Sequence, residues 1–256
     1  MKNRSLLHSL DVMIVLAQKD FKLRYRNSVL GFLWSLLNPL AYMIILTIVF
    51  SLLLRVSVPN FAAWVLIGLL FWRFFSLGTN QGLFSIINNP SLVAKVYLPR
   101  YLIVLSNNLA NLFGAILEFV VFLPLLFLLG VTPTVYLFFL PVIILLEFLL
   151  IFGLSLSLAP LNAKYRDFYQ LWDVALQLGF FLTPIVYDSQ LIPSRFRVAY
   201  LLNPMTAVIE SGRDIFLYQH LPSTFALIII TSAVGVLLIV GMIVFHALET
   251  RLAEEI

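Results

Sequence analysis

Long apolar runs, each ended by a polar or turn-forming segment, dominate the hydrophobic pattern of this sequence. A helix that crosses a bilayer needs about 20 mostly apolar residues, and six runs approach or exceed that length. They lie at about Val29–Leu54, Phe61–Phe84, Tyr101–Leu129, Val135–Leu161, Phe168–Tyr187 (interrupted near Pro184) and Thr224–Leu248. The pattern predicts an all-α integral membrane protein with six transmembrane helices in a single domain, residues 1–256.

Two further segments contain enough apolar residues to contact a membrane without crossing it. In residues 1–28 an amphipathic helix at the membrane interface is predicted, with packing on protein as the alternative. Residues 188–223 are half apolar but too short and charged to span, so we expect one or two short re-entrant helices dipping into the outer leaflet. A helix lying flat on the outer surface is the alternative. The interfacial prediction rests on the helical spacing of Leu7, Leu10, Ile14, Ala17 and Phe21.

Composition supports a lipid environment for most of the chain. Of its 256 residues 62% are hydrophobic and 11% are charged, and the mean hydropathy is +1.03. A soluble domain carries about 25% charged residues. The net charge of +4 is spread beside apolar runs rather than in one patch, so it does not indicate a nucleic-acid partner. The absence of cysteine excludes disulfides and thiol chemistry.

The distribution of Lys and Arg predicts the orientation of the chain, because cytoplasmic segments of membrane proteins carry more of these residues. With six spans and a cytoplasmic N-terminus, the inner segments hold eleven of them and the outer segments four, and Arg73 lies within a span. Both termini are therefore expected in the cytoplasm. The inner set is Lys2, Arg4, Lys19, Lys22, Arg24, Arg26, Lys95, Arg100, Lys164, Arg166 and Arg251, and the outer set is Arg55, Arg195, Arg197 and Arg213.

Sequence motifs for catalysis or nucleotide binding are absent. No phosphate-binding loop, zinc-binding His-Glu-x-x-His or nucleophile elbow occurs, so the chain is not expected to be an enzyme. Uphill transport would need an ion gradient or energy from another subunit. The ionisable residues within spans are Arg73, Glu118, Glu147 and Asp173. A structural ion pair between Arg73 and Glu118 is expected, and a proton relay is the alternative.

Aromatic and amide side chains form stripes on two of the expected spans. Trp34, Asn38 and Tyr42 recur at every fourth position, and so share one helix face. Gln170, Asp173, Gln177 and Phe181 nearly repeat this pattern, with Trp172 and Phe180 beside them. Aromatic faces with polar neighbours suit sugar rings, which predicts the lining of a translocation path. Helix–helix contacts and interfacial aromatic belts are the alternative.

Two cytoplasmic segments indicate contacts outside the bilayer. Residues 88–102 predict a short amphipathic helix between two prolines, whose exposed apolar residues would dock on a cytoplasmic partner or, alternatively, on the lipid surface. The basic cluster Lys19, Lys22, Arg24 and Arg26 is expected at the headgroup layer, where it fixes topology and contacts anionic lipid. The same cluster could also guide a lipid phosphate. The apolar residues expected to be exposed are Leu92, Val93, Val96, Tyr97 and Leu98.

Several segments, taken in order, resemble those of ABC-2 type polysaccharide export permeases, the transmembrane subunits of bacterial O-antigen, capsule and teichoic-acid exporters. They are KDFKLRYRNSVLGFLWSLLNPL, GLLFWRFFS, NNPSLVAKVYLPR, LNAKYRDF, FFLTPIVYDSQLIP and YLLNPMTAVIESGRDIFL, and they cover nearly the whole chain. Arg73 departs from the family pattern, in which an uncharged residue often follows the tryptophan.

The resemblance implies an export permease for a lipid-linked polysaccharide in a bacterial or archaeal cytoplasmic (inner) membrane. A homodimer of this chain would work with two ABC ATPase subunits, which bind the ATP and magnesium, and this chain would hold no cofactor. An ABC-2 permease for a drug or small lipid is the alternative, followed by an ion-driven carrier or flippase.

The resemblance also assigns roles to particular residues. ATPase coupling falls to Asn89, Pro90, Leu92, Lys95, Val96, Tyr97, Leu98, Pro99 and Arg100. An outer gate within residues 188–223, with its flanks, falls to Pro184, Tyr187, Pro204 and Arg213. An aromatic-rich path in relatives supports Trp34, Tyr42, Trp172 and Phe180 as lining residues, and the expected lining set also includes Asn38, Gln177 and Phe181.

Overall fold

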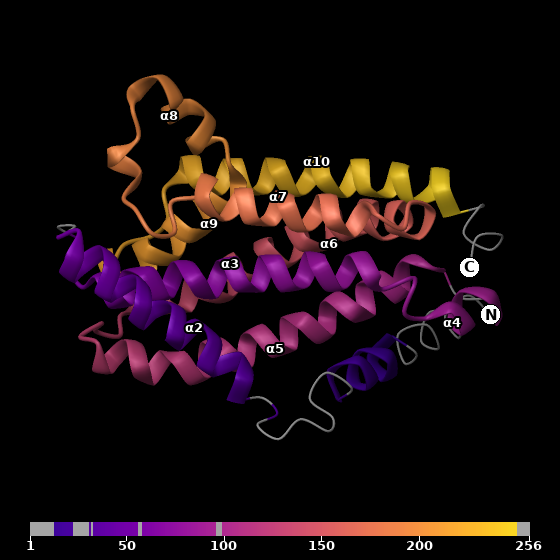
Figure 1. Ribbon diagram of the computed structural model, residues 1–256, viewed down its shortest axis with the longest axis horizontal. Coiled ribbons are helices and arrows are strands. Elements are labelled where there is room, and N and C mark those ends of the chain that lie inside the picture. Colours follow the sequence, from indigo (N-terminus) through magenta and orange to yellow (C-terminus); the bar gives the residue numbers. More distant parts are fainter. Residues whose placement is uncertain (1–12, 23–30, 32, 56–57, 96–98, 250–256) are drawn as a thin grey trace.

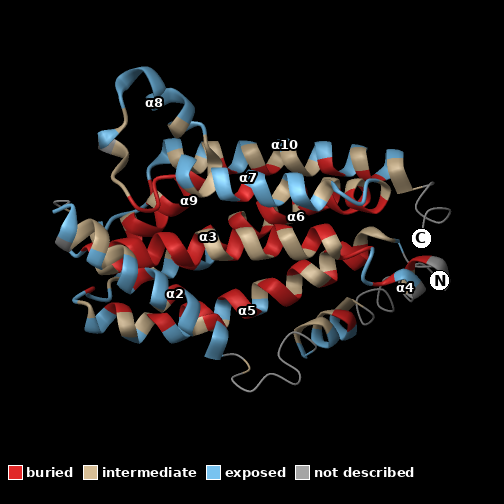
Figure 2. Ribbon diagram, in the orientation of Figure 1, coloured by how far each residue is buried: buried red, intermediate tan, exposed pale blue. Residues whose placement is uncertain are grey.

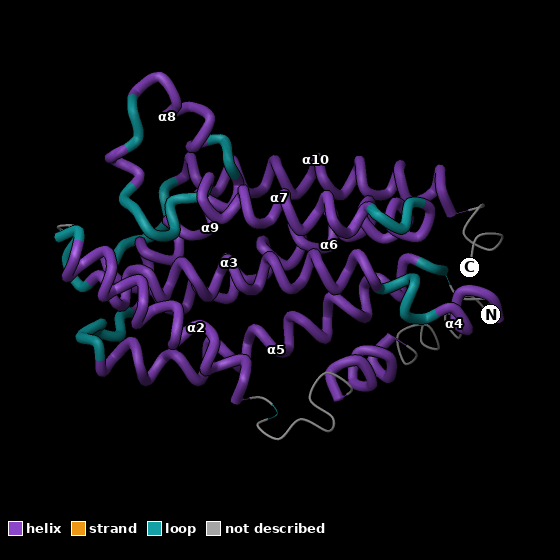
Figure 3. Tube along the Cα trace, in the orientation of Figure 1, coloured by secondary structure: helices purple, strands orange, loops and turns teal. Residues whose placement is uncertain are grey.

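The computed structural model describes residues 13–22, 31, 33–55, 58–95 and 99–249, and in these ranges helices are joined by loops without any strand (Figure 3). A helix covers residues 13–22. The remaining elements are α2 (Leu33–Leu46), the π-helix η1 (Thr47–Leu53), α3 (Phe61–Phe84), α4 (Pro90–Lys95), α5 (Tyr101–Leu128), the 3-10 helix η2 (Val135–Phe139), α6 (Leu140–Lys164), α7 (Phe168–Leu182), η3 (Ser189–Leu191), α8 (Ser194–Leu201), α9 (Pro204–Arg213), the π-helix η4 (Asp214–Tyr218) and α10 (Thr224–Glu249).

Five helical segments in the described residues are long and apolar enough to cross a membrane. They are Leu33–Ser51, Phe61–Phe84, Tyr101–Leu128, Val135–Lys164 and Thr224–Glu249, and they match five of the six expected runs. The chain is therefore an all-helical, multi-pass membrane protein.

The sixth expected span is shorter in the structure than the sequence predicts. It forms α7, which has 15 residues and ends at Leu182. At about 1.5 Å per residue this helix covers about 22 Å, less than the hydrocarbon core of about 30 Å. Thr183 is extended because it precedes Pro184, and a residue before proline avoids the helical conformation. The count of six spans stays a prediction.

Helix α3 is the centre of the bundle. In its most apolar stretch 78% of the residues are buried, against 17% in the first span and 17% in α10. It packs against α5, α6 and α9 and also contacts α2 and α7 (Figure 2). Its side chains contribute to a core that is apolar on nearly every side of the helix.

The helices run roughly along one axis, so the bundle has two distinct ends (Figure 1). The first, called the α4 end, holds α4, the start of α5 and the end of α10. The second, called the α9 end, holds α8, α9 and the start of α10. Alternating helix directions therefore place the expected cytoplasmic and outer segments at opposite ends.

The long connection before α10 holds two short α-helices with opposite environments, besides η3 and η4. No residue of α8 is buried, whereas most of α9 is buried against α3, α6 and α10. Pro204 occupies the first turn of α9, and the side chain of Asn203 caps it by accepting a hydrogen bond from the Met205 amide at 3.0 Å. The sequence predicted one or two short re-entrant helices here, and their insertion into the outer leaflet stays a prediction.

Helices α6 and α10 pack closely against each other, and their contact depends on two glycines. A Cβ on Gly241 would overlap the carbonyl oxygen of Gly153, and a Cβ on Gly153 would lie 2.9 Å from the Leu237 carbonyl carbon. Small residues allow helix backbones in membranes to approach and gain van der Waals contact. The α6–α10 contact thus requires glycine at both positions.

We predict that Gly241→Ala destabilises the protein by about 1–3 kcal/mol, because the new methyl group meets backbone that cannot move aside. Thermal unfolding of the purified protein in detergent measures this. Gly235→Ala on the same helix is the control, since a Cβ there meets nothing within 4 Å. Equal melting temperatures for the two variants would contradict the prediction.

Candidate functional site

A groove of about 500 Å³ lies between α2, α3 and α7. Both polar and aromatic side chains line it. Because α3 passes through the centre of the bundle, the groove lies within the membrane-spanning part of the molecule. The lining residues are Asn38, Pro39, Tyr42, Leu69, Trp72, Arg73, Ser76, Leu77, Asn80, Asp173, Leu176, Gln177, Phe180 and Phe181.

Five of the seven residues proposed from the sequence to line a path lie in this groove: Asn38, Tyr42, Gln177, Phe180 and Phe181. The other two do not line it. Trp34 is exposed on α2, and Trp172 packs against the core from α7. The spacing rule placed Asn38 and Tyr42 correctly on one face, but it could not show which part of each face another helix covers.

Sequence reasoning missed the contribution of α3 to the groove. Trp72, Ser76 and Asn80 recur at every fourth position, with Arg73 beside them. The same periodic signal was present in the sequence, but the apolar residues surrounding it on α3 obscured it. Trp72 also reaches α7, where a Cβ on Gly179 would lie 2.9 Å from its ring. Its ring centroid is 6.0 Å from that of Phe180.

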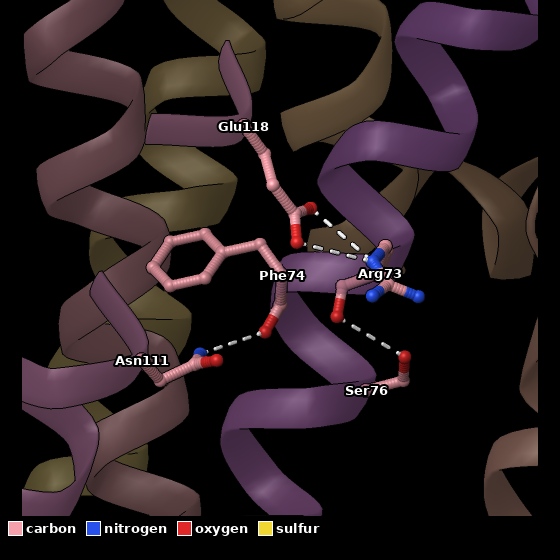
Figure 4. Close-up of polar contacts among 5 residues, drawn as sticks. All are labelled: Arg73, Phe74, Ser76, Asn111 and Glu118. Carbon is pink, nitrogen blue, oxygen red and sulfur yellow. Dashed lines mark hydrogen bonds and ion pairs between the residues drawn. The ribbon is translucent and has the colours of Figure 1, made fainter. Parts of the chain in front are cut away.

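The expected ion pair between Arg73 and Glu118 is confirmed (Figure 4). The Arg73 Nε donates to both carboxylate oxygens of Glu118, at 3.3 Å and 3.2 Å. Next to this pair, Asn111 donates from Nδ2 to the carbonyl of Phe74 at 3.2 Å. These two contacts connect the middle of α3 to α5.

The wall opposite Arg73 carries a carboxylate. Asp173 on α7 accepts a hydrogen bond from Gln177 Nε2 at 2.8 Å, one turn further along the helix. The groove therefore presents a cation on α3 and an anion on α7. Uncharged donors and acceptors lie around them, on Asn38, Tyr42, Ser76 and Asn80.

Two smaller hollows continue the groove along α3 toward the α4 end. One of about 200 Å³ shares Leu77 and Asn80 with the groove and adds Asn88 and Asn107 to the lining. The other hollow, of about 440 Å³, shares Phe84 with the 200 Å³ hollow and is lined also by Asn162, Arg166 and Tyr169. Through these shared residues the three hollows follow one another along α3, and each has polar and aromatic lining.

At the α4 end, short polar contacts join helices that are distant in sequence. Lys19 Nζ donates to Asn89 Oδ1 at 3.2 Å, and Arg100 Nη1 donates to the Glu249 carbonyl at 2.6 Å. Phe21 packs edge-on against Phe113 of α5, with centroids 4.8 Å apart. The helix over residues 13–22 thus contacts protein, and Lys22 is exposed. Arg24 and Arg26 lie outside the described residues.

The apolar side of α4 faces the bundle more than the sequence led us to expect. Val93 is buried and Leu92 packs beside it, in a cluster with Ile86, Ile103 and Phe245. The expectation that both would be exposed is wrong, because the ends of the long helices offer an apolar surface that covers them. Pro90 begins the helix and Pro99 is exposed. Val96, Tyr97 and Leu98 lie outside the described residues, as does the side chain of Lys95.

At the α9 end, Arg213 is completely buried and joins three segments. Its Nη1 donates to the Pro184 carbonyl and to Glu210 Oε1, each at 2.8 Å, and its Nη2 donates to the Ile185 carbonyl at 3.1 Å. The guanidinium carbon lies 3.3 Å from the centroid of the Trp64 ring. The sequence singled out Arg213, and the structure places it against α3 and the α7–α8 connection.

Burial lowers the pKa of Arg213 to about 10, while Glu210 opposes that shift. The guanidinium therefore stays protonated near neutral pH. Burial also raises the pKa of Glu210, and the charge of Arg213 partly offsets this. The contacts of Arg213 are accordingly charge-assisted, the stronger class of hydrogen bond.

The remaining residues expected at an outer gate lie close to Arg213. Tyr187 donates its hydroxyl to the Phe181 carbonyl at 2.7 Å, and its oxygen is 3.2 Å from the Tyr200 hydroxyl. Asn203, just before Pro204, donates from Nδ2 to Thr183 Oγ1 at 3.1 Å. These contacts hold the chain after α7 against α8 and α9. They lie next to Phe181, which is the groove residue of α7 nearest the α9 end.

Comparison with known proteins adds independent information on this arrangement. The sequence model of the ABC-2 type transporter family matches residues 12–217. An O-antigen export system permease protein of Klebsiella pneumoniae, RfbA, is 33% identical over 95% of this chain and 94% of its own length. RfbA of Myxococcus xanthus is 32% identical over 99% and 98%. The polysialic acid transport protein KpsM of Escherichia coli is 21% identical over 90% and 91%.

We predict that Arg213→Met destabilises the protein by about 3–5 kcal/mol, because Glu210 and two backbone carbonyls lose their donor inside the protein. Hydrogen exchange of the backbone amides after α7 should rise in the same variant, and thermal unfolding measures the loss of stability. The control is Arg197→Met on the exposed helix α8. A similar melting temperature and exchange pattern in both variants would rule out this role for Arg213.

Proposed function

This chain belongs to the ABC-2 type transporter family, and on that premise we propose that it is the membrane permease subunit of an ATP-driven exporter for a lipid-linked polysaccharide. Relatives that cover nearly the whole chain are named for O-antigen export or polysialic acid transport. The observation that carries the proposal is the groove between α2, α3 and α7, whose lining combines aromatic and amide side chains.

The chemistry of the groove suits a sugar polymer. A pyranose ring has C–H faces that pack on aromatic rings, and its hydroxyl groups need both donors and acceptors at the edges. Tyr42, Trp72 and Phe180 supply rings, while Asn38, Asn80 and Gln177 supply amides. An amide both donates and accepts, so it can bond hydroxyl groups of either orientation. A path for a drug or small lipid, the alternative substrate, would need fewer such groups.

A second copy of the chain would complete the path. The groove opens to the surface, and its walls α2 and α7 expose large apolar and aromatic side chains such as Tyr42, Leu178 and Phe181. We place the path between two copies that face each other across this opening, with both termini in the cytoplasm of a bacterial or archaeal cell. Lys19, Lys22, Arg24 and Arg26 then lie in the cytoplasmic headgroup layer.

Energy for transport would come from two ABC ATPase subunits, which bind ATP and magnesium and dock at the α4 end. Contacts at that end offer a route for the motion. Asn89 and Arg100 flank α4, and they are bonded to the N-terminal helix and to the end of α10. A displacement of α4 would therefore move both helices, and the side chains after Lys95 would provide the docking surface.

One observation favours an ion-driven carrier as a second candidate. Glu147 is fully buried in α6, and neither carboxylate oxygen has a hydrogen-bond partner among the described residues. Buried carboxyl groups within a membrane often take part in proton transfer. Reconstitution separates the two functions: export that needs the ATPase and ATP supports an ABC exporter. Transport by this chain alone along an ion gradient would contradict it.

We predict that Tyr42→Ala lowers polymer export by about 2- to 10-fold, because a stacking surface of the groove is lost while the protein still assembles. Tyr42→Phe should retain most of the export rate, since it keeps the ring. Export is measured in cells or vesicles containing the assembled complex. Phe138→Ala is the control, as Phe138 is exposed outside the groove. Wild-type export by Tyr42→Ala would assign this residue to packing alone.

We predict that Leu92→Asp reduces the ATPase activity of the assembled complex by roughly fivefold or more, because a misplaced α4 transmits less motion. The assay is ATP hydrolysis by the purified complex, with size-exclusion chromatography to establish assembly. Leu128→Asp, at the exposed end of α5 that points to the α9 end, serves as the matched control. Full activity in an intact Leu92→Asp complex would refute α4 as the coupling element.

A further inference from the structure

Arg73 lies near the middle of α3, the most buried of the five candidate spans, and this is the costliest depth for a charge in a membrane protein. Placing arginine at the centre of a transmembrane helix costs about 3 kcal/mol on insertion scales, so the side chain must face protein or a polar cavity. It does both, because one edge of the guanidinium contacts Glu118 and the side chain lines the groove.

Glu118 uses only part of the hydrogen-bonding capacity of Arg73. Both hydrogen bonds to Glu118 run from Nε, and the two Nη atoms point away from the carboxylate (Figure 4). A guanidinium carries five N–H donors, so four remain on the Nη atoms. Among the described residues the structure gives these four donors no acceptor.

We propose that Arg73 is the anion-binding residue of the groove, where its Nη groups bind a phosphate or carboxylate of the cargo at mid-membrane depth. The inference rests on the proposed function, because it takes the groove to be the path. An anionic group meets its highest energy at the centre of the bilayer, and a cation at that depth offsets this cost. Glu118 holds the guanidinium in place by its Nε edge and leaves the planar fork to the cargo.

A purely structural role explains the geometry less well. A buried ion pair adds little net stability over apolar residues of similar size, so stability alone gives weak reason for a charge here. A structural pair would also be expected to use the guanidinium fork, which matches a carboxylate with two parallel bonds. Asp173, the anion on the opposite wall, is bonded to Gln177, so the groove keeps a cationic side and an anionic side.

The anionic group has two possible sources in a lipid-linked polysaccharide. One is the phosphate that joins the polymer to its lipid, and the other is an acidic sugar within the polymer. Both groups present two oxygens that a guanidinium can bind at the same time. Two probe pairs separate them: a polyprenyl diphosphate against the corresponding polyprenol, and a glucuronate oligosaccharide against a glucose oligosaccharide of the same length.

Binding of the four probes is measured on the complex with its ATPase, in lipid nanodiscs without ATP. In Arg73→Gln the affinity for the anionic member of one pair should fall roughly tenfold or more, since a charge-assisted bond is lost. Affinity for the neutral member should stay unchanged. The pair that responds identifies the source. Glu118→Gln should keep or strengthen anion binding, because it removes the competing negative charge and retains the side-chain volume.

The opposite behaviour of the two variants is decisive. If Arg73 serves only the ion pair, neither variant changes the preference for anionic over neutral probes, which overturns the proposal. If Arg73→Gln does not fold, Arg73→Lys, which keeps the charge, and Glu118→Gln carry the test through the same preference. The two proposals can fail separately. Normal export by Tyr42→Ala counts against the groove as the path, whereas loss of the anionic preference in Arg73→Gln still supports anion binding by Arg73.

Discussion

A polar side chain inside a lipid bilayer needs a partner from protein, water or cargo, and this requirement governs the arrangement around α3. The helix is surrounded by neighbours, and several of them supply hydrogen bonds to it. Asn111 of α5 bonds the Phe74 carbonyl, Asn162 of α6 bonds the Leu83 carbonyl at 3.4 Å, and Glu118 pairs with Arg73. Ser76 and Asn80 of α3 face the groove instead, together with Arg73. The groove is therefore where α3 offers polar side chains to a molecule between the helices.

The two ends of α3 are fixed by different chemistry. At the α9 end, Trp64 lies against the buried guanidinium of Arg213, which also holds the carbonyls after α7. At the α4 end, α3 leads into Asn89, which bonds both the Ser85 carbonyl and Lys19. A rigid helix with a tethered segment at each end can relate movements at the two surfaces of the membrane. Such a connection is what the proposed ATP-driven mechanism requires.

Much of this architecture could be predicted from the sequence, and the exceptions have physical reasons. Apolar run length located five spans, because hydrocarbon imposes a minimum length that is visible in any sequence. It overestimated α7, since Pro184 ends the helix although the apolar composition continues. Helical spacing pointed to Asn38 and Tyr42, which line the groove, and to Trp34 and Trp172, which do not, because periodicity defines a helix face but not the helix that packs on it.

Burial also explains the errors at particular residues. Val93 was expected on the surface of a short loop helix, but the ends of four long helices create a covered apolar site that no local pattern reveals. On α3 the stripe of Trp72, Ser76 and Asn80 was hidden, because a helix buried on nearly all sides has little hydrophobic asymmetry. The sequence singled out Arg213 but could not show its contacts, because Pro184 and Trp64 lie far away along the chain.

The walls of the groove differ in how firmly they are held, and this difference indicates where the groove can widen. On the α3 side, most residues are buried and fixed by contacts with α5, α6 and α9. On the α7 side, Leu176 is the one buried residue of the helix, and α2 buries Ser35, Pro39 and Met43. The first span also changes to a π-helix after Leu46, a geometry that often marks functional positions. Since motion favours elements with few buried contacts, α2 and α7 can separate while α3, with Arg73 and Trp72, stays in place.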